Sequence, residues 1–172
     1  ERIWGGRQLE TFYSKQLPPQ VRIGESWEIC DRPEDQSIVI NGDLAGKNLE
    51  WLMAQYHDEI LGSVHDLKGR FPLLVKILDC TQDLSIQIHP DEETGKKLGG
   101  ESKTEMWRIT HVEPGSHIYA GFKRGVVSND FELALRQGDG KKIAAMLNQP
   151  IVRETDTILI PARGIHALGK GI

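Results

Sequence analysis

Short runs rich in aliphatic and aromatic residues, separated by Gly, Pro and Asp turns, constrain the fold of this chain more than any other feature. The runs lie at residues 26–29, 71–79, 84–90, 105–110, 117–120 and 157–161. Runs of this length between turn residues favour β-strands over helices. The pattern predicts a mainly β fold, an all-β barrel or jelly roll with short helical inserts. The runs at 71–79 and 84–90 are expected to pair as neighbouring antiparallel strands.

A few segments depart from the strand pattern. Residues 48–56 carry apolar residues at helical spacing, and residues 141–148 form a second short helix-like insert. Helix is not expected in residues 1–30, because adjacent prolines and glycine turns interrupt them. We expect a single domain over residues 1–172 with a small helical insert at about residues 44–68.

The composition excludes several classes of partner. The formal net charge is −4 and the Lys and Arg residues are scattered, so the chain offers no basic stripe to nucleic acid or to an anionic membrane. No stretch approaches the roughly 18 apolar residues of a membrane span. Cys30 and Cys80 match no metal or disulfide spacing, which favours reduced thiols in a cytoplasmic protein. The chain begins at Glu1 rather than Met, and we expect that its first residues were trimmed or processed.

The run Leu84–Pro90 carries the first half of a candidate metal site. Residues i and i+2 of a strand point to the same face, so Gln87 and His89 project together while Ile86 and Ile88 pack on the other side. A single His on a strand is more often a hydrogen-bonded structural residue than a ligand. Gln87 and His89 can form a metal site only if neighbouring strands supply further metal ligands.

Glu105 and His166 are well placed to complete the set, because each lies at the edge of a later strand-like run. Two imidazoles, a carboxylate and an amide oxygen suit zinc or a similar first-row ion that keeps a position for water or substrate. A closed structural zinc site would more often use thiolates. The sequence therefore predicts one divalent ion per chain, with zinc preferred, held by Gln87, His89, Glu105 and His166.

Several motifs resemble one known family, in its order and over nearly the whole chain. They are Trp4-Gly5-Gly6, residues 24–28, residues 71–79, residues 84–91, residues 103–107 and residues 160–169. The L-S-I-Q-I-H-P and K-T-E-M-W blocks are specific, and the chain resembles type I mannose-6-phosphate isomerase (phosphomannose isomerase). The resemblance implies a cupin jelly-roll fold, zinc on the four residues already named, and a sugar phosphate as partner. It also implies the interconversion of mannose 6-phosphate and fructose 6-phosphate by proton transfer between C2 and C1.

The resemblance assigns roles to two further residues. Lys103 matches the family's active-site lysine, which implies that it moves a proton or holds the sugar. Ser85 resembles a position near the phosphate, although a cross-strand hydrogen bond explains it equally well. For Lys76 we favour a charge pair with Glu25, Glu28 or Asp79 over a role in the cavity.

Residues of two other types have a structural interpretation. Trp27 and Trp107 are expected in the core, because large aromatic residues fill barrels more often than they bind sugar. The remaining histidines occur in no ligand spacing and are interpreted as surface or structural residues. They are His57, His65, His111 and His117.

The chain departs from the family pattern at two places. Arg163 follows Pro161-Ala162 where the family usually has Gly, so a positive φ there would carry a steric penalty unless Gly164 takes up the irregularity. The chain also stops at Ile172, which implies that the C-terminal half of the family, with its catalytic arginine, is absent. These 172 residues alone are then expected to lack isomerase activity.

Two alternative functions remain open. One is a non-catalytic metal- and sugar-binding cupin module, or an inactive fragment of the enzyme. The other is a metal-dependent oxygenase or epimerase of the wider cupin group, although Gln87 in place of a first His argues against an iron oxygenase. The sequence predicts no oligomeric state.

Overall fold

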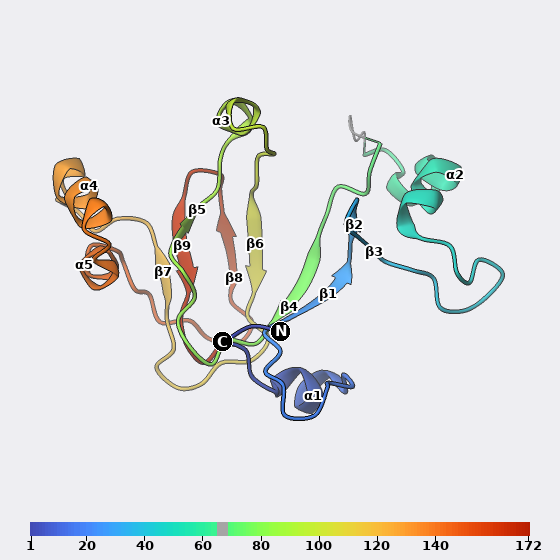
Figure 1. The fold of residues 1–172 in the computed structure, drawn as a ribbon, viewed down its shortest axis with the longest axis horizontal. Helices are drawn as coiled ribbons and strands as arrows, with labels where there is room; N and C mark the ends of the chain where they lie inside the picture. Colours follow the sequence, from blue (N-terminus) through green and yellow to red (C-terminus); the bar gives the residue numbers. More distant parts are fainter. Residues whose placement is uncertain (65–68) are drawn as a thin grey trace. The chain divides into compact units, whose positions relative to one another are not determined.

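The computed structural model describes residues 1–64 and 69–172. Its helices are α1 (Gln8–Tyr13), α2 (Leu49–Leu61), α3 (Glu92–Lys97), α4 (Ser128–Arg136) and α5 (Gly140–Ala145). Its strands are β1 (Glu25–Ile29), β2 (Asp31–Arg32), β3 (Asp35–Gln36), β4 (Val75–Leu78), β5 (Gln87–Ile88), β6 (Glu105–Arg108), β7 (Ile118–Ala120), β8 (Thr157–Ile160) and β9 (Ile165–Leu168) (Figure 1). The chain forms two compact units, one of residue 1 with residues 7–78 and one of residues 2–6 with 79–172.

The first unit contains α1, α2 and two small antiparallel sheets, β1–β4 and β2–β3. On the β1–β4 sheet, Lys76 Nζ lies 3.1 Å from Glu25 Oε2 and 4.3 Å from the centre of the Trp27 ring. The Trp27 indole N–H donates to the same Glu25 oxygen. The expected charge pair of Lys76 with Glu25 is therefore confirmed.

Helix α2 begins where the sequence predicts a helix. The Asn48 side chain accepts the Trp51 N–H at 2.9 Å and satisfies one donor of the first turn, and Gly62 follows the last turn at φ +58°. The helix lies inside the predicted insert at about residues 44–68. The last four residues of that insert, including His65, lie outside the described residues.

The second unit contains the sheets β5–β9–β7 and β6–β8, joined by the turn between β8 and β9. Tyr119, Leu147, Ile165 and Ala167 form its buried cluster, with Phe131 of α4 and Ala144 of α5 packed against it. Ile165 and Ala167 flank His166 on β9, so the side chain of His166 projects to the opposite face of the sheet.

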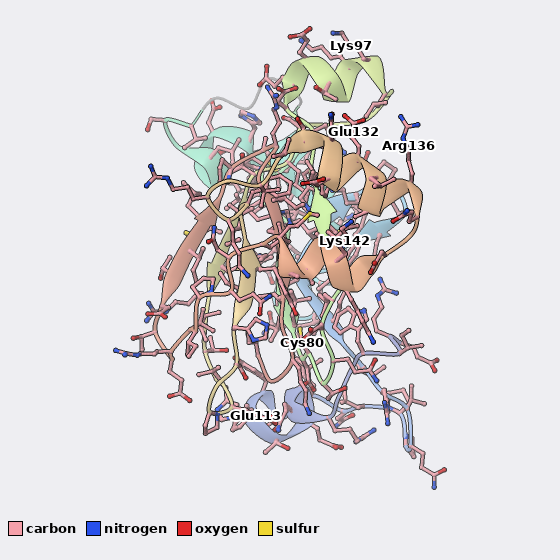
Figure 2. All side chains as sticks on the ribbon, turned by 90° about the vertical axis from the view of Figure 1, so that its left-hand side faces the viewer. Cys80, Lys97, Glu113, Glu132, Arg136 and Lys142 are labelled. Carbon is pink, nitrogen blue, oxygen red and sulfur yellow. The ribbon has the colours of Figure 1, made fainter. Side chains whose placement is uncertain are left out.

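The charged residues of α4 and α5 lie on the outside of the second unit. Figure 2 shows Glu132, Arg136 and Lys142 projecting from these two helices, and Lys97 at the far end of α3. This arrangement leaves the inner faces of α4 and α5 for the apolar cluster. Within the described part of the chain, no helix has the length and apolar character that crossing a membrane requires.

Two sequence-based expectations about the fold are wrong. The runs at 71–79 and 84–90 do not pair with each other, because β4 pairs with β1 and β5 pairs with β9. Residues 1–30 are not free of helix, because α1 forms there. The prediction of a mainly β fold is supported in part, because the nine described strands form sheets of two or three strands, and none of these sheets closes into a barrel.

Because the phenol of Tyr119 is buried, the stability of the protein is expected to fall at alkaline pH. Its hydroxyl donates to Asp83 Oδ2 at 2.7 Å, and the side chain is 7% exposed. Burial, followed by the hydrogen bond and the charge of Asp83, raises the pKa of Tyr119 to about 12. The folded state therefore prefers the neutral phenol, and this stabilisation is complete below about pH 10 and is lost as the pH rises towards 12.

We expect Tyr119→Phe to remove that pH dependence. Between pH 9 and pH 12 the free energy of unfolding of the parent should fall by on the order of 2 kcal/mol more than that of the variant. Urea unfolding of both proteins at a series of pH values measures the difference. Parallel pH profiles of the two proteins would contradict it.

Candidate metal centre

Three strands bring two histidines and a glutamate of the second unit together. His89 directly follows β5, Glu105 opens β6 and His166 lies on β9. One ligand atom from each residue lies within 4.8 Å of the others. His89 Nε2 is 3.3 Å from Glu105 Oε1, and His166 Nε2 is 3.6 Å from Glu105 Oε2. The structure thus brings together three of the four predicted ligands.

Strand register explains why residues so far apart in the sequence meet. Gln87 on β5 lies directly opposite His166 on β9, so the two side chains share a face of the sheet. The segment that carries α3 then turns back, and the Lys103 N–H donates to Pro90 O at 3.2 Å. This return places Glu105 beside His89. The sequence predicts His166 at the edge of a strand-like run, and the structure places it within β9.

A hydrogen bond to the main chain fixes the orientation of the His166 ring. Nδ1 lies 2.8 Å from the carbonyl oxygen of Gly164. A carbonyl only accepts, so Nδ1 carries the proton and the lone pair resides on Nε2, the atom that faces Glu105. A backbone partner of this kind commonly fixes the tautomer of metal-binding histidines.

His89 is also held with its Nε2 lone pair towards the cluster. The Lys103 ammonium lies 3.2 Å from this nitrogen and can only donate to it. Burial, followed by the positive charge of Lys103, lowers the pKa of His89. Neutral imidazole is the form that binds metal, so both effects favour ligation near neutral pH.

Glu105 is held as a carboxylate by its neighbours. Burial opposes its ionisation, but the hydrogen bond and charge of Lys103, with smaller contributions from His89 and His166, lower the pKa of Glu105 below its usual value. The Lys103 ammonium contacts Oε1, and the Trp107 indole N–H donates to Oε2 at 3.1 Å. The two carboxylate oxygens therefore have different partners.

Trp107 belongs to this site, which corrects its expected place as a core residue. Its ring centre lies 5.5 Å from that of His166 in an edge-on arrangement, besides its hydrogen bond to Glu105. The spacing from Glu105 could have indicated this contact, because residues i and i+2 of a strand share a face.

The donor set and its spacing fit a divalent metal ion. In tetrahedral zinc sites with bonds of about 2.0–2.1 Å, ligand atoms lie about 3.3 Å apart, which is close to the separations found here. Two neutral imidazole nitrogens and one carboxylate match the ligands of zinc sites that keep an open position. His89, Glu105 and His166 could therefore hold a metal ion.

Gln87 and Ser85 lie beside the cluster. The Gln87 amide N–H donates to Ser85 Oγ at 3.0 Å, which turns the amide oxygen of Gln87 away from Ser85. Both side chains are exposed. The hydrogen-bond partner of Ser85 is thus Gln87, two positions along the chain at the start of β5, and not the cross-strand partner considered from the sequence.

The described histidines outside the cluster lie where the sequence suggested. His57 pairs with Asp58 and His111 pairs with Glu154, both at the surface. His117 is partly buried with its ring 5.0 Å from that of Tyr119. None of the three belongs to the metal-ligand cluster found in the described residues.

Comparisons with known proteins give the family. Residues 1–101, more than half of the chain, match the model of the phosphomannose isomerase type I catalytic domain. The mannose-6-phosphate isomerase ManA of Bacillus subtilis is 34% identical over 100% of the chain and 52% of its own length. The mannose-6-phosphate isomerase of Streptococcus mutans is 33% identical with the same coverage.

A solved structure agrees with these matches. The crystal structure of the mannose 6-phosphate isomerase from Bacillus subtilis matches with a TM-score of 0.85 and 32% identity, over 99% of this chain and 52% of that one. The short strands and the cluster of His89, Glu105 and His166 are typical of a β protein with a metal-binding site. The chain belongs to the type I phosphomannose isomerase family. It spans about half the length of the curated relatives that it matches.

Proposed function

We propose that the protein carrying this chain interconverts mannose 6-phosphate and fructose 6-phosphate with one zinc ion at the candidate metal centre. The observation that carries the proposal is the convergence of His89, Glu105 and His166 within 4.8 Å, with the Lys103 ammonium on the same carboxylate. Family membership supports the substrate class. We further propose Gln87 as the fourth ligand, because it lies opposite His166 and its amide oxygen turns away from Ser85.

The proposed isomerisation moves hydrogen without net oxidation. A base removes the C2 proton of the open-chain aldose, and the electron pair forms the C1–C2 double bond of an enediolate. Transfer of the O2 proton to O1 and protonation of C1 then give the ketose. Such a reaction needs a base, positive charge near the developing oxyanion and an anchor for the phosphate.

The residues of this chain supply part of that requirement. The Lys103 side chain is 47% exposed and contacts Glu105 and His89, so it can donate a hydrogen bond to a sugar oxygen or pass a proton. Zinc at the centre would supply positive charge for the oxyanion. Ser85, exposed beside Gln87, is proposed to contact the substrate near its phosphate.

The proposed fold is a cupin jelly roll, of which the sheets β5–β9–β7 and β6–β8 are parts. The close match to the solved Bacillus subtilis isomerase supports this assignment. In such barrels the inward-facing residues of several strands meet at a common centre. His89, Glu105 and His166 come from three different strands or strand ends in this way.

A coupled assay of fructose 6-phosphate formation from mannose 6-phosphate, made on the full-length protein that carries this chain, tests the function. Turnover should be lost on chelation and restored by zinc. Lys103→Ala should lower kcat by about a hundredfold, because it removes a group that contacts the reacting sugar. The matched control is Lys97→Ala on α3, which should leave kcat within about twofold, because Lys97 pairs with Glu93 at the surface. Stoichiometric zinc binding without turnover would contradict the isomerase and favour a metal-binding module.

A further inference from the structure

The turn between β8 and β9 has an unusual residue at its third position. The Gly164 N–H donates to Pro161 O at 3.0 Å and closes the turn. Arg163 has φ +67°, in the left-handed region that glycine adopts without steric cost. Gly164 is not in that region, so it does not relieve Arg163. A non-glycine residue held in this conformation points to a functional constraint on its side chain.

Each inner residue of this turn bonds to a different part of the candidate metal centre. The Ala162 N–H donates to the hydroxyl of Thr104, next to Glu105, at 3.3 Å. The Arg163 N–H donates to His89 O at 2.7 Å. The Gly164 oxygen accepts from His166 at 2.8 Å. The turn therefore contacts all three ligand-bearing segments.

The side chain of Arg163 extends this support to the segment that carries α3. Its guanidinium lies 3.5 Å from Asp91 Oδ2 and is 75% exposed. Asp91 begins α3 by accepting the Thr94 N–H at 2.8 Å. Because that segment leads to Lys103 and Glu105, Arg163 holds the end of β5 through its main chain and the start of α3 through its side chain.

We infer that Arg163 is a positioning residue of the metal centre, which keeps His89 and the segment leading to Glu105 in register for an ion. The inference rests on the proposed metal site. Arg163 itself contacts the main chain of His89 and the side chain of Asp91, and not the donor atoms of the proposed ligands. Glycine at this position would keep the N–H bond to His89 and remove the steric cost, but it would lose the contact with Asp91. Affinity for metal and stability of the metal-free protein should therefore change in opposite directions.

Cobalt titration of the full chain, followed by visible absorption, tests the inference. Arg163→Gly should raise the Kd for cobalt about three- to tenfold, because the lost contact is an exposed ion pair behind the ligands. The Tm of the metal-free variant should equal or exceed that of the parent, because the left-handed strain is removed. A purely structural role would lower Tm without this separate loss of affinity.

Asp91→Asn provides the matched partner, because asparagine caps a helix as well as aspartate but lacks the charge. It should raise the Kd for cobalt by a similar factor. The double variant should bind cobalt no more weakly than either single variant, because both substitutions remove the same contact between Arg163 and Asp91. Arg136→Ala, at an equally exposed arginine of α4, should bind cobalt like the parent.

The outcomes separate the two proposals. If the parent binds cobalt and Arg163→Gly binds it equally tightly, or if the effects of Arg163→Gly and Asp91→Asn add in full, the positioning role is overturned while the metal site stands. If the parent itself binds no cobalt, the proposed metal site fails, and the role of Arg163 fails with it.

Discussion

Replacing Glu105 with alanine is expected to raise the dissociation constant for zinc by about a thousandfold, or roughly 4 kcal/mol of binding free energy. Apparent zinc affinities of structural sites, about 10–16 kcal/mol, correspond to about 2.5–4 kcal/mol for each of four ligands. Glu105 contributes the carboxylate of the cluster and lies within 3.6 Å of both imidazole Nε2 atoms. Its removal also leaves the Lys103 ammonium beside His89 without its carboxylate partner, which disfavours binding of a second cation at the same place.

Calorimetric titration with zinc, and metal content after dialysis, measure the effect. The parent should retain about one equivalent, and zinc should raise its Tm, because a ligand that binds the folded state stabilises it. Glu93→Ala is the control: this glutamate is 79% exposed and pairs with Lys97 on α3, so its loss should leave the zinc affinity unchanged. Equal zinc content in the parent and in Glu105→Ala would show that Glu105 is not a ligand of the metal ion.

The candidate site was predictable to the extent that local geometry determines it. Gln87 and His89 share a strand face by the alternation of side chains alone, and Asn48 marks the start of α2 by its capping bond. Glu105 and His166 needed more than local geometry. They meet His89 only because β5 pairs with β9 and the α3 segment turns back. The resemblance to a family supplied what periodicity could not.

Strand partners were the least predictable feature of the fold. The runs at 71–79 and 84–90 look like a hairpin, since a short polar segment separates them. In the structure they pair with β1 and β9, which are distant in sequence. Nothing in the composition of a short apolar run selects its partner, because the cross-strand contacts that decide it belong to the folded state.

Helix α3 lacks the apolar stripe that would reveal it. It consists of charged residues with Thr94 and Gly95, and it is supported by the Asp91 cap and by acidic and basic residues at its opposite ends. Hydrophobic periodicity therefore gave no signal for α3. Helix α4 does carry Phe131, Ala134 and Leu135 at helical spacing, and the sequence-based prediction missed it.

Replacing Gly169 with alanine is expected to destabilise the protein by about 3 kcal/mol or more. A Cβ at this position would lie 2.1 Å from the carbonyl oxygen of His117. The Gly169 N–H also donates to that oxygen at 3.0 Å, so the two main-chain segments cannot separate without breaking the bond. Because Gly169 directly follows β9, the strand of His166, its displacement should also disturb the metal centre.

Urea unfolding of the metal-free chain measures this loss, and Gly140→Ala is the matched control. Gly140 opens α5, does not have a positive φ, and has no neighbouring atom within 4 Å of the place that an alanine methyl group would occupy. Alanine there should be neutral or stabilise by about 0.4–1 kcal/mol, because it restricts the unfolded chain. An unfolding free energy of Gly169→Ala within about 0.5 kcal/mol of the parent would show that the segments before β7 and after β9 lie further apart than the structure places them. The clash is with main chain rather than with a movable side chain, so Gly169→Ser should be at least as destabilising.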